Sequence, residues 1–101
     1  MNTIQKIAQE RPNYFMCSKS SVPWMLQRAR KEVEELLTDF RRYFSGNFSV
    51  DLRAVECGLC WKICATLKVN DKVCREYEEL DFLFIDLNQL MLNRAKKELS
   101  L

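Results

Sequence analysis

The sequence predicts an all-α fold: an antiparallel bundle of three long helices, at about residues 22–44, 50–69 and 72–99, plus a short N-terminal helix. The chain of 101 residues contains only two glycines and two prolines, and so few breakers favour long uninterrupted helices. Hydrophobic residues make up 48% and charged residues 30%, which is the balance of a globular protein. The connections between the apolar segments are short, and short connections make consecutive helices antiparallel.

A single domain, residues 1–101, is expected to consist of an N-terminal helix and docking loop (1–21) and a three-helix core (22–101). The short helix is expected at residues 2–10. It ends before Pro12, because proline disfavours helical geometry in the residue that precedes it. The loop that follows is rich in large apolar side chains, so we expect it to pack on the core.

The first long helix is expected to begin near Val22, because Ser20 or Ser21 can cap it and Pro23 suits its first turn. Gly46 is expected to end it. Its apolar residues recur in steps of four and three, which places them on one stripe: Ala29, Val33, Leu36, Phe40 and Tyr43.

The second and third long helices are predicted from similar spacing. Between residues 50 and 69 the helical face is formed by Leu52, Val55, Leu59, Ile63 and Thr66. Asn70 and Asp71 can form the connection, and a heptad-like seam then follows: Val73, Tyr77, Leu80, Phe84, Leu87 and Met91. Residues 80–87 could instead form a strand, because residues 82–85 are four consecutive apolar side chains. We favour the helix because helical spacing continues on both sides.

Four cysteines form the most suggestive cluster for chemistry, because four thiolates can bind zinc tetrahedrally: Cys57, Cys60, Cys64 and Cys74. The first three lie at helical spacing in the predicted helix 50–69, whereas structural zinc sites usually place cysteine pairs on turns. Free cysteine also behaves as a small buried hydrophobe. We interpret these residues as core and expect no metal and no cofactor. A thiol redox or zinc-binding function remains an alternative, in which Cys64 and Cys74 could approach each other across the connection.

Catalytic residues are not evident in the sequence. The chain contains no histidine, which is the commonest general acid or base. It also lacks a glycine-rich phosphate loop and a nucleophile elbow. The carboxylates between residues 76 and 86 are expected to be solvated on a helix surface. The sequence therefore predicts a protein that is not an enzyme.

Basic residues of the first long helix offer an alternative function in nucleic-acid binding. A cationic helical face can contact phosphates and recognise duplex RNA or DNA. The candidate residues are Arg28, Arg30, Lys31, Arg41 and Arg42. Two features oppose this function: acidic residues are interleaved between positions 32 and 35, and the net charge of the chain is only +2.

Surplus apolar surface is the strongest functional indication. Trp24, Phe82, Ile85 and Leu92 fall off the main helical stripes, and three helices cannot easily cover them all. Exposed apolar patches mark interfaces. The alternative is that the N-terminal segment covers these side chains. We predict a non-enzymatic helical protein–protein interaction module, such as a small adaptor, inhibitor or accessory subunit. Its partner is expected to be another protein or a second copy in a homodimer.

Membrane and export signals are also absent from the pattern. No stretch is long and apolar enough to predict a membrane span, and the first residues lack the apolar region of a signal peptide. We therefore expect an intracellular protein, cytoplasmic or nuclear, whose cysteines are reduced thiols.

Overall fold

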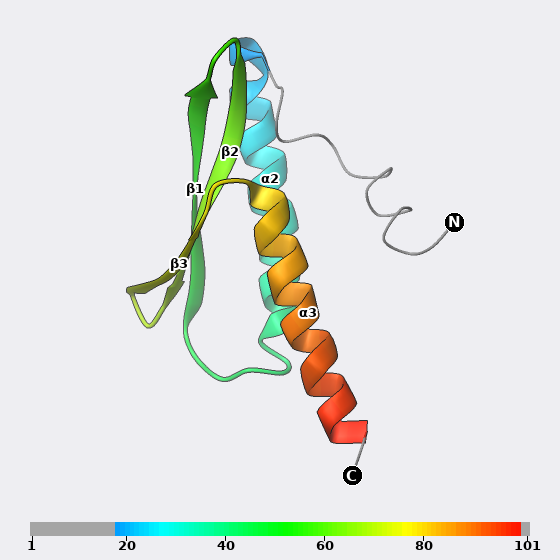
Figure 1. Cartoon of the computed structure of the whole chain (residues 1–101). Coiled ribbons are helices and arrows are strands. Elements are labelled where there is room, and N and C mark those ends of the chain that lie inside the picture. Colours follow the sequence, from blue (N-terminus) through cyan, green and yellow to red (C-terminus); the bar gives the residue numbers. More distant parts are fainter. Residues whose placement is uncertain (1–17, 100–101) are drawn as a thin grey trace, which may run out of the picture.

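The computed structural model describes residues 18–99, which form two helices packed on one face of a three-stranded sheet (Figure 1). The order along the chain is helix, three strands, helix. The elements are a short 3-10 turn η1 (Lys19–Ser21), helix α2 (Val22–Phe40), strands β1 (Phe48–Cys57), β2 (Cys60–Val69) and β3 (Lys72–Tyr77), and helix α3 (Leu80–Leu99).

The sheet is an antiparallel meander with the strand order β1-β2-β3. Gly58 and Leu59 form the two-residue turn between β1 and β2, and Gly58 has a φ of 64°. Asn70 and Asp71 form the turn between β2 and β3 with φ values of 52° and 67°. Positive φ in both central residues is typical of the tight turns whose twist matches a hairpin. The register between β2 and β3 shifts at Leu67/Lys68.

The hydrophobic core lies between the helices and the sheet. Helix α2 and strand β2 each provide several of the buried side chains, and the first half of α3 completes the cluster. Its buried members are Met25, Ala29, Val33, Leu36, Leu37, Phe40, Phe48, Ile63, Ala65, Leu67, Tyr77, Leu80, Leu83, Phe84 and Leu87. At the end of α2, Phe40 stacks on Phe44 and meets the ring of Phe48 edge to face, with ring centroids 4.5 and 5.0 Å apart.

The prediction of an all-α helical bundle is wrong, because the segment predicted as the helix 50–69 forms β1 and β2. Apolar residues alternate with polar ones on β1, and the members that pack on the core are Phe48, Val50, Leu52 and Ala54. This period of two places them on one face of a sheet. Both faces of β2 also carry apolar residues, so a spacing of three and four could be found there by chance.

The third predicted helix, 72–99, is also wrong in its first part, since β3 occupies Lys72–Tyr77 before α3 begins at Leu80. Residues 80–87 are helical, as favoured over the strand alternative. The first predicted helix, 22–44, corresponds to α2, which begins at the predicted residue and ends at Phe40. The predicted N-terminal helix and most of its docking loop lie outside the described residues.

Candidate interaction surface

Helix α3 has two apolar faces. One face carries Leu80, Leu83, Phe84 and Leu87, which are at most 3% exposed in the core. The other face carries six residues that we call the outer stripe: Phe82, Ile85, Gln89, Leu92, Lys96 and Leu99. At 3.6 residues per turn, the outer stripe lies on the side of α3 away from the buried residues.

The outer stripe has the spacing of a coiled-coil seam. Its members follow one another in steps of three, four, three, four and three residues, which is the a/d pattern of a heptad repeat. Four of the six are large and apolar, and their exposed fractions are 51% for Phe82, 64% for Ile85, 48% for Leu92 and 86% for Leu99. At 1.5 Å per residue the stripe is about 26 Å long. Large apolar side chains that recur along the exposed side of a helix in this way are typical of an interface.

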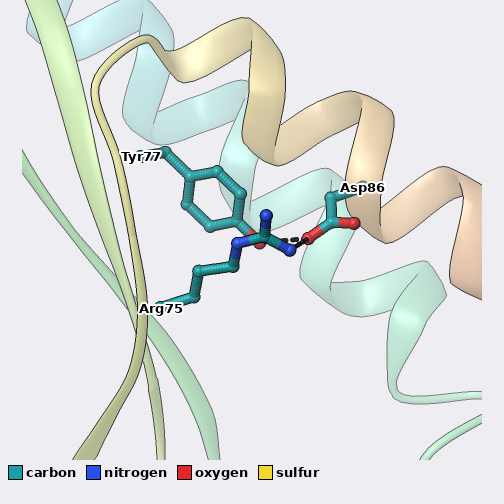
Figure 2. A network of polar contacts seen from close by, with 3 residues as sticks. All are labelled: Arg75, Tyr77 and Asp86. Atoms are coloured by element: carbon teal, nitrogen blue, oxygen red, sulfur yellow. Dashed lines mark hydrogen bonds and ion pairs between the residues drawn. The ribbon is translucent and has the colours of Figure 1, made fainter.

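A polar cluster fixes the first half of α3 against β3 (Figure 2). The hydroxyl of Tyr77 donates a hydrogen bond to Asp86 Oδ2 at 2.5 Å, and Arg75 Nη1 contacts the same oxygen at 2.9 Å. The guanidinium of Arg75 also lies over the ring of Tyr77, 5.4 Å from its centroid. Burial and the hydrogen bond to Asp86 raise the pKa of Tyr77 above its ordinary value. The cluster therefore helps to set which side of α3 faces solvent.

Two shallow hollows border the outer stripe. Phe82 and Ile85 line the first, together with β3 residues such as Arg75. Leu92 lines the second, where α3 passes the end of α2 beside Tyr43. Figure 1 shows that the last turns of α3 then run on beyond α2 and the sheet. The stripe is thus accessible along its length, and its final part projects from the core.

Charge is distributed unevenly along α3. Asp81 and Asp86 lie in the first two turns, whereas the last two turns carry Arg94, Lys96 and Lys97 with a single acid, Glu98. Arg94 pairs with Glu98 at 3.4 Å. Acidic side chains near the N-terminus and basic ones near the C-terminus suit the helix dipole. They also make the two ends of the outer stripe complementary in charge.

Trp24 does not lie on the outer stripe, although the sequence grouped it with Phe82, Ile85 and Leu92. It is 56% exposed on the first turn of α2, and the guanidinium of Arg28 lies 5.6 Å from its ring centroid. Among residues 18–99, those that line the shallow hollow around it all belong to α2. Conversely, the sequence interpretation missed Leu99 and the cluster at Asp86. The heptad spacing from Phe82 could have identified Leu99. The contact of Asp86 with β3 could not be found from the sequence, because it depends on how α3 packs on the sheet.

The basic residues of the nucleic-acid alternative lie along α2 and just after it. Arg28 pairs with Glu32 at 3.8 Å, and Arg42 pairs with Asp39 at the same distance. Arg41 donates a hydrogen bond from Nη2 to the carbonyl oxygen of Phe48 at 2.9 Å. Arg30 and Lys31 are exposed. Three of the five candidates thus already contact groups of the protein itself.

Cys57, Cys60 and Cys64 do not share one helix, contrary to the expectation from the sequence. Cys57 and Cys60 flank the Gly58–Leu59 turn, Cys64 lies in β2 and Cys74 in β3. Cys64 is buried and donates a hydrogen bond from Sγ to the carbonyl oxygen of Glu78 at 3.2 Å. Within residues 18–99, no three cysteine, aspartate, glutamate or histidine residues are grouped so that they could hold a metal ion.

Neither described helix is long and apolar enough to cross a membrane. Comparisons with protein-family models, curated proteins and solved structures found no match to this chain.

Proposed function

We propose that this chain is a non-enzymatic protein–protein interaction module that binds its partner through the outer stripe of α3. The observation that supports this function is the second apolar face of α3, because a helix that only covers a core needs one. Coiled-coil seams use the same residue spacing, with large apolar side chains that fill holes in the facing helix. We further propose that the module works in the cytoplasm or nucleus, as expected from the sequence.

The partner that best fits the stripe is the same stripe on a second copy of the chain. When two stripes run antiparallel with their centres together, Phe82 of one copy lies opposite Leu99 of the other. The acidic first turns of each α3 then lie beside the basic last turns of its partner. A parallel pair would instead bring like charges together at both ends. Charge complementarity therefore favours an antiparallel homodimer with twofold symmetry.

Two of the six stripe positions are polar, which limits the affinity but helps to fix the register of the pair. Gln89 lies near the centre of the stripe. Lys96 can extend its amine out of the apolar layer towards the acidic end of the other copy. We therefore expect a weak dimer, which should be followed over protein concentrations from about 1 µM to about 1 mM.

The test is sedimentation equilibrium of paired variants. Ile85→Glu combined with Leu92→Glu places two carboxylates in the stripe, and we expect this variant to remain monomeric at every concentration. Trp24→Glu is the control for location, because it places one such carboxylate on an exposed aromatic position of α2, away from the stripe. We expect the control to dimerise as the wild type does. A double variant that still dimerises would exclude the outer stripe as the interface.

Single charge reversals test the direction of the pair. In the antiparallel dimer, Asp81→Lys places a lysine beside the basic end of the other copy at both ends of the interface. We expect the dissociation constant of the dimer to rise about fivefold, because a symmetric dimer loses two exposed ion pairs. In a parallel pair the same substitution exchanges one like-charge contact for another, so an unchanged affinity would point to the parallel direction.

A further inference from the structure

The tip of the β1–β2 hairpin holds two cysteines face to face. Cys57 ends β1, Cys60 begins β2, and the two are partners in the antiparallel register. Directly opposed residues of an antiparallel pair have Cα atoms about 4.5 or 5.5 Å apart. Disulfides form at Cα separations of about 4.4–6.8 Å. Either spacing falls in that range, so the hairpin brings both thiols within reach of one bond.

This arrangement distinguishes Cys57 and Cys60 from the other cysteines of the described chain. Cys64 is buried, lies opposite Arg53 and bonds to a backbone carbonyl. Cys74 is exposed on β3 at the shift in register, and no cysteine of residues 18–99 is its partner in the sheet. The opposed pair thus combines proximity with access to solvent.

Access differs between the two members of the pair. Cys57 is exposed, whereas Cys60 is partly covered. Leu59 stands fully exposed between them, and a Cβ added at Gly58 would contact nothing within 4 Å, so the tip is open to small reagents. This places Cys57 as the thiol that meets a reagent first and Cys60 as the thiol beside it.

We propose that Cys57 and Cys60 form a reversible dithiol–disulfide site that reacts with low-molecular-weight disulfides of the glutathione type. The thiolate of Cys57 attacks one sulfur of the disulfide, so that a mixed disulfide forms and one glutathione thiolate leaves and takes up a proton. The thiolate of Cys60 then attacks Cys57 Sγ and releases the second glutathione thiolate. Two cysteine thiols are oxidised to one disulfide, and one glutathione disulfide is reduced to two thiols.

The test treats the folded full chain with oxidised glutathione, blocks the remaining thiols by alkylation and locates each modification by peptide mass spectrometry. For the wild type we expect a Cys57–Cys60 disulfide and little glutathione adduct. For Cys60→Ser we expect a stable adduct on Cys57, at least about tenfold more abundant than in the wild type, because the neighbouring thiol that removes it is absent. Cys74→Ser is the matched control for loss of an exposed thiol and should behave as the wild type.

Two results would overturn the site. The first is a wild-type protein that accumulates as much adduct on Cys57 as Cys60→Ser does. The second is a wild-type protein in which Cys57 and Cys60 remain free while Cys74 is modified. The site is independent of the α3 interface, so Ile85→Glu combined with Leu92→Glu should leave the disulfide yield unchanged.

Discussion

The two helices rest on the same face of the sheet, yet they differ in what they present to solvent. Helix α2 buries one stripe and covers its other sides mainly with charged residues, with Trp24 as the large exposed apolar side chain. Helix α3 also buries one apolar stripe, but it exposes a second apolar stripe to solvent. A helix with one apolar face is complete once it is packed, whereas α3 keeps a second apolar face exposed, and this is the face through which we propose that it binds a partner.

The sharpest test of this comparison is to truncate one leucine on each face of α3. Leu87 is fully buried, and Leu87→Ala should lower the free energy of unfolding by about 3 kcal/mol. Leu92 is 48% exposed, and Leu92→Ala should cost less than about 1 kcal/mol. Urea denaturation at a concentration where the chain is monomeric measures both. Equal losses of unfolding free energy in the two variants would contradict a buried Leu87 and an exposed Leu92.

The contact of α3 with β3 gives the next largest expected effect. Asp86→Ala removes the acceptor of the Tyr77 hydroxyl, and Tyr77 is only 6% exposed. Leaving that buried donor without its partner should lower the free energy of unfolding by about 2 kcal/mol. Asp81→Ala removes the same charge outside the cluster and should cost about 0.5 kcal/mol through the helix dipole. Urea denaturation measures the loss of unfolding free energy in each variant. Similar losses would show that the cluster does not stabilise the contact of α3 with β3.

Gly58→Ala distinguishes the observed hairpin from the helix that the sequence predicted, because the substitution should change the stability of the two structures in opposite directions. In a helix interior, alanine would stabilise the chain by about 1 kcal/mol relative to glycine. In the observed turn, Gly58 has a φ of 64°, which costs an L-residue about 1 kcal/mol or more. We therefore expect a lower midpoint of thermal unfolding. A raised midpoint would contradict the β1–β2 turn.

The smallest expected effect is a pH dependence at Tyr77. The raised pKa means that the folded chain keeps the phenol protonated at pH values where the unfolded chain has lost its proton. Stability contributed by Tyr77 is therefore full below about pH 10 and declines as the pH rises above it. Tyr77→Phe should flatten this alkaline decline in unfolding free energy. Urea denaturation of both proteins at a series of alkaline pH values measures the difference.

The sequence allowed α2 to be predicted because its apolar residues occupy one stripe and its start carries Pro23. The strands were missed because apolar side chains lie on both faces of the hairpin. Cys64, for example, is buried on β2 without belonging to the core cluster under the helices. The two-residue turns also lack the common Asn-Gly and Asp-Gly pairs. Only the period of two from Phe48 to Ala54 and the isolated Gly58 indicated a hairpin.

The candidate site was partly readable from the sequence. Three members of the outer stripe could be predicted because they lie outside the apolar seam that packs in the core: Phe82, Ile85 and Leu92. Their common stripe with Leu99 depends only on helical spacing, so the sequence alone was sufficient for it. The separation of Trp24 from that stripe could not be derived, because it depends on how α2 and α3 pack. The opposition of Cys57 and Cys60 likewise depends on the register of the hairpin.

The most direct measurement of the central claim is the mass of the wild-type chain in solution as its concentration is raised. The chain has a mass of 12.0 kDa. We expect sedimentation equilibrium to show a reversible rise towards twice that mass, and we expect the rise to disappear when Ile85 and Leu92 are both replaced by glutamate. A wild-type mass that stays at 12.0 kDa up to about 1 mM would contradict pairing through the outer stripe.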